Sequence, residues 1–317
     1  MVGTEIASFT VCEDPALNAR HGDRLRFEQV LPHFELTPRF ADIKNWDVFQ
    51  GILLAVTSSD SSDDTILGSA TMVAPGIALS ATHNLADILP ELRRGGMTMM
   101  CIGIASTGAQ AWKVHKVTPI AGTDICILGL LCASEIPQTR TFYEATMTTR
   151  LPAIGERLLM TGYRASSTAF RRDNERTTNL EASLYISSGV VTQQFVRSRD
   201  SAKLPSPTLE VDCPTLGGMS GGPVFASRGY LVGMVTSAVV GGHEPAPTYT
   251  ALLWPIFGHP FQGGWPSTLV GSEPKSLLDM NARHLCKIEQ PEAVSLSLEG
   301  ARLSISYKPW SRLRATD

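Results

Sequence analysis

The sequence predicts an all-β protein, either a barrel or a sandwich, and three observations favour this fold class. From residue 49 onward, short runs of β-branched and aliphatic residues are separated by turns rich in Gly, Pro, Asp and Ser. These runs recur at the spacing that is typical of sandwiches and barrels. The helical segments that would alternate with strands in a parallel α/β sheet are missing.

The runs form two groups of six expected strands each, which a connection at residues 137–149 separates. The first group comprises residues 49–56, 67–74, 77–80, 97–104, 111–118 and 126–131. The second group comprises residues 157–163, 180–192, 208–211, 222–225, 230–239 and 249–255. The predicted division of the chain is therefore a first β unit at 48–137, and a linker with a second β unit at 138–258.

The two ends of the chain lie outside this pattern. Residues 1–47 show no clear periodicity and are assigned to an N-terminal extension, and residues 259–317 to a C-terminal extension. Within the latter, 276–288 is compatible with a helix, and 293–307 alternates as in a β-hairpin with a turn at Glu299-Gly300. One face of that hairpin would carry Val294, Leu296, Leu298, Leu303 and Ile305.

Composition excludes several classes of protein. The chain has 317 residues, 43% of them hydrophobic, so it can bury a sizeable core, and disorder or a fibrous repeat is excluded. A formal net charge of −3 without a long basic run argues against a nucleic-acid partner. The longest uncharged apolar run, at 125–133, is too short to span a membrane, and the N-terminus lacks the features of a secretory signal.

The cysteines favour a reducing environment. All six lie far apart and form no CxxC motif, so a zinc site is not expected. We expect buried free thiols and a cytoplasmic location. The cysteines are Cys12, Cys101, Cys126, Cys132, Cys213 and Cys286.

The most informative segment is GGMSGGP at residues 217–223, which follows one expected strand and precedes another. Glycines on both sides of Ser220 allow positive φ and let a substrate carbonyl approach the main chain closely. The N–H groups of Gly218 and Ser220 could converge on a developing oxyanion. Ser220 is therefore the candidate nucleophile.

A serine hydroxyl needs a base, and that base needs a partner that fixes its tautomer. His83 follows the expected strand at 77–80, and Asp124 begins the apolar run at 125–133. Both lie at strand ends, where loops often carry functional groups. The predicted catalytic residues are His83, Asp124 and Ser220, and Asp87 is expected to be a solvated or capping residue.

Three segments, LSATHN at 79–84, TDICIL at 123–128 and GMSGGP at 218–223, resemble those of the chymotrypsin-like (trypsin-fold) serine peptidases. The order His, Asp, Ser and the separations are similar too. The resemblance covers residues 49–258. It implies two six-stranded antiparallel β-barrels of the trypsin-like fold, with His83 and Asp124 on the first barrel and Ser220 on the second.

Two departures from the family are informative. Animal members have a disulfide at the positions of Gly68 and Asn84, so the resemblance is to prokaryotic or intracellular members. Those members also have an aspartate before the serine, which binds the new N-terminus after zymogen cleavage, and here the residue is Met219. Constitutive activity, loop ordering, a regulatory partner protein and oligomer formation remain open as modes of control.

The resemblance also indicates where substrate would bind. Pro214 and Thr215 would lie at the base of the primary specificity pocket, and Thr236, Ser237 and Ala238 would form one wall. Because no acidic residue occupies the base, we expect a small or apolar residue before the scissile bond.

The predicted function is that of a serine endopeptidase that cleaves protein or peptide substrates through an acyl-enzyme, without metal or organic cofactor. Two alternatives remain. Residues 218–222 also fit the G-x-S-x-G pattern of α/β-hydrolases, for which Asp279 and His284 would complete a triad in an esterase. A trypsin-fold module that binds peptides without turnover is the second alternative.

Overall fold

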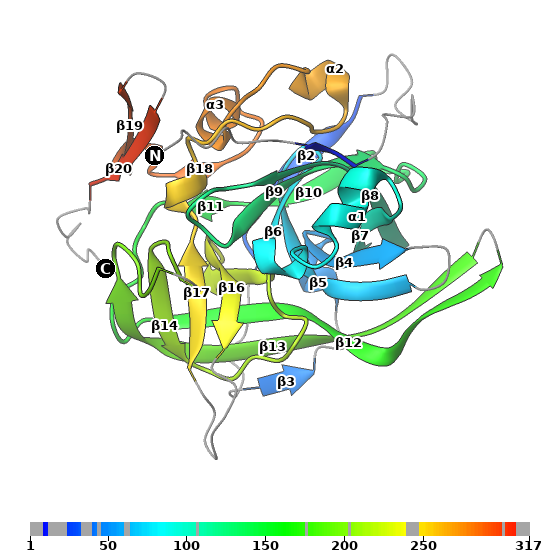
Figure 1. Ribbon diagram of the computed structural model, residues 1–317, viewed down its shortest axis with the longest axis horizontal. Coiled ribbons are helices and arrows are strands. Elements are labelled where there is room, and N and C mark those ends of the chain that lie inside the picture. The colour runs from blue at the N-terminus through cyan, green and yellow to red at the C-terminus, as the bar shows by residue number, and fades with distance from the viewer. Residues whose placement is uncertain are drawn as a thin grey trace.

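The computed structural model describes residues 9–11, 24–32, 40–42, 46–59, 64–105, 108–174, 177–201, 204–238, 247–299 and 302–308. Over these residues the chain is mostly β and forms two closed six-stranded antiparallel barrels (Figure 1). The predicted fold class is confirmed.

The first barrel is closed by the pairing of β8 (Gly108–Pro119) with β9 (Ile125–Cys132). Strand β9 is buried along its whole length, whereas every second residue of β7 (Thr98–Ala105) is buried, as expected for a barrel wall. In order around the barrel, the strands are β4 (Leu53–Ser59), β5 (Asp64–Ala74), β6 (Ile77–Ala81), β9 (Ile125–Cys132), β8 (Gly108–Pro119) and β7 (Thr98–Ala105). A 3-10 helix, Thr82–Asn84, and helix α1 (Leu89–Arg94) connect β6 to β7.

The second barrel closes through the pairing of β15 (Pro223–Ala226) with β12 (Arg157–Asn174). Its first two strands continue past the barrel as a long hairpin, which projects from the body at the right of Figure 1. In order, the strands are β12 (Arg157–Asn174), β13 (Thr177–Phe195), β14 (Thr208–Asp212), β17 (Thr248–Leu252), β16 (Leu231–Ala238) and β15 (Pro223–Ala226).

Segments outside the barrels add short strands to their edges. In the N-terminal part, β1 (Phe9–Thr10) pairs with β8 and β3 (Phe40–Asp42) pairs with β13. Between the barrels, β10 (Thr141–Ala145) pairs in parallel with β2 (Arg26–Val30). Further along, β11 (Met147–Thr148) pairs in parallel with β16 and with β18 (Ile288–Glu289). The predicted connection therefore contains two strands.

The first predicted strand began too early. Trp46–Phe49 forms a 3-10 helix, and Gln50 and Gly51 then take positive φ, so β4 begins only at Leu53. The last predicted strand of the second barrel likewise ends at Leu252, because a 3-10 helix, Trp254–Ile256, follows it.

Within its described residues, the C-terminal segment contains two short α-helices, α2 (Ser267–Val270) and α3 (Leu277–Ala282). The predicted helix at 276–288 was too long. A capping box between Ser276 and Asp279 starts α3, but His284 adopts a φ of 57° soon after the helix ends. The strand β18 (Ile288–Glu289) and a 3-10 helix, Pro291–Ala293, follow.

The predicted C-terminal hairpin is present as β19 (Val294–Glu299) and β20 (Arg302–Tyr307). Its turn lies one residue later than expected, because Glu299 pairs with Arg302, and the two turn residues are outside the described part of the chain. In the register of the hairpin, Leu296 pairs with Ile305 and Leu298 with Leu303.

The buried residues form two clusters. The smaller one fills the second barrel, and the larger one joins the first barrel to the C-terminal segment. Trp112 on β8, Phe142 on β10 and Trp265 before α2 pack edge-to-face with centroids 5.3–5.8 Å apart. The C-terminal segment is thus part of the first barrel's core.

Five cysteines, all except Cys12, lie within the described residues, and each is free and buried. Burial raises the pKa of the thiols of Cys101, Cys126 and Cys286. The prediction of buried free thiols is confirmed for these five, and Cys12 is outside the described residues. The cytoplasmic location stays a prediction. Among the helices of the described ranges, none has the length and apolar character required to span a membrane.

Candidate active site

His83 lies at the end of β6, in the 3-10 helix Thr82–Asn84. β6 is fully buried, so it anchors this turn in the first barrel. The N–H of Thr82 donates to the backbone carbonyl of Asp124 at 2.9 Å, and the N–H of His83 donates to Asp124 Oδ1 at 3.1 Å. These bonds tie the two turns together and leave the imidazole 46% exposed.

Asp124 orients the imidazole. Its Oδ2 lies 2.7 Å from His83 Nδ1, and its side chain is only 13% exposed. A carboxylate can only accept hydrogen bonds, so Nδ1 carries the proton and Nε2 of neutral His83 is left as an acceptor. The hydroxyl of Thr236 on β16 donates to the same Oδ2. The predicted His–Asp pair is therefore assembled in the structure.

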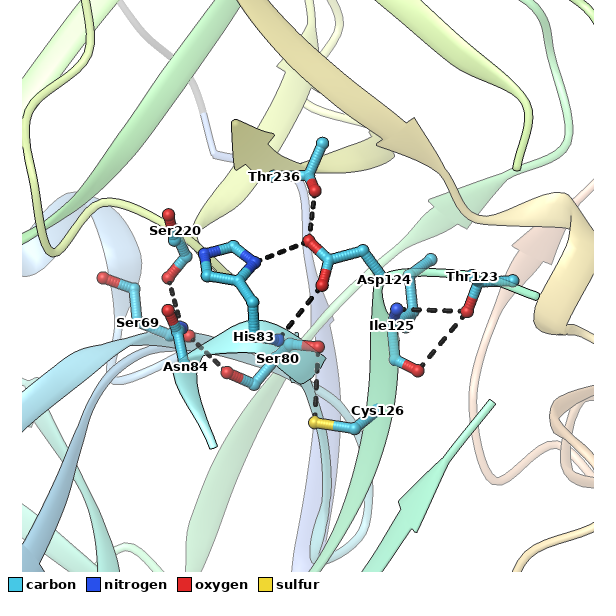
Figure 2. Close-up of polar contacts among 10 residues, drawn as sticks. All are labelled: Ser69, Ser80, His83, Asn84, Thr123, Asp124, Ile125, Cys126, Ser220 and Thr236. Carbon is cyan, nitrogen blue, oxygen red and sulfur yellow. Dashed lines mark hydrogen bonds and ion pairs between the residues drawn. The ribbon is translucent and has the colours of Figure 1, made fainter. Parts of the chain in front are cut away.

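Ser220 lies on the other side of the imidazole from Asp124, in the turn between β14 and β15 (Figure 2). The ring nitrogen that faces away from Asp124 points toward Ser220. No hydrogen bond joins the Ser220 hydroxyl to the imidazole among the contacts of the described residues. Such bonds are often long in unliganded enzymes and shorten when substrate is bound. The structure brings together all three predicted catalytic residues from two barrels.

The backbone around Ser220 has the conformation that the glycines predicted. Gly218 and Gly221 have φ of +94° and +81°. The N–H groups of Met219 and Gly221 donate to the carbonyls of Leu216 and Val235. Within the described part of the chain, the N–H groups of Gly218 and Ser220 donate no hydrogen bond. Both predicted oxyanion donors are therefore available to an acceptor.

The residues predicted to contact substrate differ in their surroundings. Pro214 and Thr215 follow β14, and Thr215 Oγ1 lies 2.9 Å from Thr248 Oγ1. The side chain of Thr236 is buried and bonded to Asp124, and the wall formed by its strand stays a prediction. Ser237 and Ala238 continue β16, but their side chains are outside the described residues.

Sequence reasoning missed two residues that contact the serine turn. The amide of Asn84 donates to the carbonyl of Ser220 at 2.9 Å, and the hydroxyl of Ser69 donates to the carbonyl of Gly218 at 2.9 Å. Both residues lie on the first barrel, more than 130 residues away from the turn in sequence. No local pattern signals such contacts, although Asn84 directly follows His83.

The α/β-hydrolase alternative is wrong. Ser220 precedes a strand, β15, whereas that fold requires a helix after the nucleophile. The side chain of Asp279 accepts hydrogen bonds from the N–H and hydroxyl of Ser276 at the start of α3. It therefore serves as a helix cap, and His284 is an exposed residue after that helix.

Comparison with known proteins gave structural similarity at low sequence identity. No curated protein matches the chain. The apo protease domain of MamO from Magnetospirillum magneticum has 15% identity and a TM-score of 0.41, covering 64% of this chain and 93% of that one. Deg5 has 15% identity and a TM-score of 0.44, with coverages of 64% and 84%. The HtrA-type protease AlgW with a decapeptide has 13% identity and a TM-score of 0.41, with coverages of 64% and 61%.

The comparison with protein families gives the clearest match. The trypsin-like peptidase domain matches residues 68–234, which is more than half of the chain. This range contains His83, Asp124 and Ser220, and it extends from β5 of the first barrel to β16 of the second. The resemblance seen in the sequence is confirmed, and the chain belongs to the trypsin-like peptidase domain family.

Proposed function

We propose that this protein is a serine endopeptidase in which Ser220, His83 and Asp124 form the catalytic triad. The observation that carries the proposal is the arrangement of the imidazole, with Asp124 bonded to Nδ1 at 2.7 Å and Ser220 on the opposite side of the ring. This geometry matches the requirements of a nucleophile, a base and an orienting carboxylate.

In the proposed reaction, Ser220 Oγ attacks a peptide carbonyl while His83 Nε2 accepts the hydroxyl proton. Asp124 stabilises the resulting imidazolium, and the N–H groups of Gly218 and Ser220 stabilise the oxyanion. His83 then protonates the leaving amine, the C–N bond breaks, and an acyl-enzyme forms. Water, deprotonated by His83, hydrolyses the ester and releases the acid product and Ser220.

We further propose that substrates have an uncharged residue before the scissile bond. At the predicted base of the specificity pocket, Thr215 and Thr248 contact each other through their hydroxyls, and Thr248 Oγ1 donates to the carbonyl of Cys213 at 2.8 Å. Hydroxyls that bond to each other offer no counter-charge to a basic or acidic side chain. Cleavage of a peptide library, sequenced by mass spectrometry, tests this, and a strong basic or acidic preference would contradict it.

A fluorophosphonate probe tests the function itself. The probe reacts with serines that a base activates, so the full-length protein should be labelled at Ser220, and His83→Ala should abolish the labelling. His284→Ala is the matched control, because it removes an exposed imidazole outside the site and should leave labelling unchanged. A folded protein that is not labelled and cleaves no peptide of the library would contradict the proposal and favour the non-cleaving binding module.

A further inference from the structure

We infer that Asn84 and Ser69 are positioning residues that hold the turn around Ser220 from the first barrel and thereby set the direction of the Ser220 N–H, one of the two proposed oxyanion donors. The inference rests on the proposed peptidase function and adds two residues that act through the backbone of the serine turn rather than on substrate.

Asn84 contacts the nucleophile's own carbonyl. Its Nδ2 donates to the carbonyl oxygen of Ser220 at 2.9 Å (Figure 2). Gly68 provides the space for this amide, since a Cβ at residue 68 would collide with Asn84 Nδ2 and lie 2.9 Å from the Ser220 carbonyl oxygen. Gly68 and Asn84 therefore form a matched pair, in which the missing side chain of one accommodates the amide of the other.

Ser69 holds the same turn with two groups. Its N–H donates to the Ser220 carbonyl at 2.9 Å, and its hydroxyl donates to the Gly218 carbonyl at 2.9 Å. The hydroxyl also accepts a bond of 2.8 Å from the N–H of Tyr163, which fixes where its own proton points. Ser69 is fully buried, so these bonds are shielded from water.

These contacts constrain three consecutive peptide planes. A carbonyl and the N–H that follows it share one rigid plane. In the plane that follows Gly218, the Gly218 carbonyl accepts from the Ser69 hydroxyl and the Met219 N–H donates to Leu216. In the plane that follows Ser220, the Ser220 carbonyl accepts from Asn84 and from the Ser69 N–H, and the Gly221 N–H donates to Val235. In the plane between them, the carbonyl of Met219 accepts from Gly222 N–H at 2.9 Å. The N–H of Ser220 in that plane is consequently fixed in direction while it remains free to donate.

Met219 anchors the turn from the opposite side. Its side chain is fully buried in the core of the second barrel, and its sulfur accepts a bond from Leu216 N–H at 3.3 Å. The turn is thus held by apolar packing in one barrel and by hydrogen bonds from the other. An ion pair with a new N-terminus is not required to order it.

Two variants test the inference in the full-length protein. Asn84→Ala removes the amide donor at a half-buried position, and Ser69→Ala removes the hydroxyl. We expect kcat per titrated active site to fall about 10- to 100-fold with KM within about twofold, because a misplaced Ser220 N–H weakens transition-state binding selectively. Ser276→Ala is the control: it loses the cap of α3, far along the chain, and destabilises the fold without changing kcat.

Hydrogen exchange of the peptide covering residues 216–222 gives a readout that does not need activity. At matched global stability, this peptide should exchange faster in Asn84→Ala and Ser69→Ala than in Ser276→Ala. Unchanged kcat and unchanged exchange would overturn the inference. If the wild-type protein neither reacts with the probe nor cleaves peptides, the peptidase proposal fails, and the exchange result still decides whether the two residues position the turn.

Discussion

The hydroxyl of Thr236 on the second barrel donates a hydrogen bond to the carboxylate of Asp124 on the first. Asp124 thereby accepts from three donors, since the backbone N–H and the Nδ1 of His83 also bond to it. The orientation of the imidazole is consequently coupled to the position of one barrel relative to the other.

Thr236→Val should lower kcat about 10- to 100-fold, because hydrogen bonds to a charged group contribute about 1.5–3 kcal/mol. Valine has a similar volume, so the core of the second barrel should stay packed. Peptide hydrolysis measured as a function of pH checks this prediction. Thr236→Ser, which keeps the hydroxyl, should recover most of the rate, and equal losses in both variants would contradict the proposed role.

Asp124→Asn should lower kcat by about four orders of magnitude while the fold is retained. An amide at this position can donate to Nδ1, which favours the tautomer with the proton on Nε2, where it cannot serve as a base. Stopped-flow acylation of an activated ester measures the loss directly. A decrease of less than about tenfold would indicate that the carboxylate is not the orienting group.

Gly68→Ala and Asn84→Ala should be strongly non-additive. The methyl group that Gly68→Ala introduces would displace the Asn84 amide, so this change should lower both kcat and the free energy of unfolding in the wild type. When Asn84 has already been replaced by alanine, the new methyl group no longer meets the amide, so Gly68→Ala should lower the free energy of unfolding by less. Urea unfolding of all four proteins gives the coupling energy, expected at about 0.5–3 kcal/mol. A coupling near zero would mean that the two residues are independent.

Met219→Asp should destabilise the protein by about 3 kcal/mol or more, because it introduces an unpaired charge among buried apolar side chains. Met219→Leu conserves volume and should cost less than about 1.5 kcal/mol. Thermal unfolding checks the pair. If Met219→Asp were as stable as the wild type, an unassigned cation would have to reach this position, and the proposed apolar anchor would be wrong.

Glu144→Gln should become increasingly stabilising as pH rises. Burial raises the pKa of the Glu144 carboxyl well above its usual range, and the hydrogen bond of 2.6 Å from Gln29 opposes this shift only in part. In the unfolded chain the carboxyl ionises near pH 4.3, at about its reference pKa. Its contribution to stability is therefore complete below that pH and is lost as pH rises toward the folded pKa. Urea unfolding of both proteins between about pH 4 and 8 should show the difference growing, and a constant difference would contradict it.

The barrels could be predicted because each strand carries its own signal of composition and length. The strands β6, β8 and β9 were located to within a few residues. The segments of His83, Asp124 and Ser220 stand out in the sequence because they adjoin the strands β6, β9 and β15. Errors arose where local geometry competes with composition. Residues 46–49 form a 3-10 helix that includes the first residue of the predicted strand at 49–56. The C-terminal hairpin turns one residue later than its Glu-Gly pair suggested.

The contacts that hold the serine turn could not be read from the sequence. Ser69 and Gly218 are 149 residues apart, and the bond between them depends on how two closed barrels pack. The parallel pairing of β2 with β10 also joins segments that lie far apart in sequence. The residues of β2 do not alternate between apolar and polar side chains, so nothing marks this segment as a strand. The bond from the Thr236 hydroxyl to Asp124 was likewise not predicted, because a strand pattern does not reveal which neighbour a given hydroxyl meets.

Trp265 lies more than a hundred residues after the first barrel ends, yet it packs against Trp112 and Phe142 and donates its N–H to the carbonyl of Pro75. A nascent chain therefore cannot complete the hydrophobic interior of the first barrel until residue 265 has been synthesised. Shortened versions that stop after the second barrel would expose these rings to solvent and should aggregate, so the minimal folding unit is longer than the stretch that carries the triad.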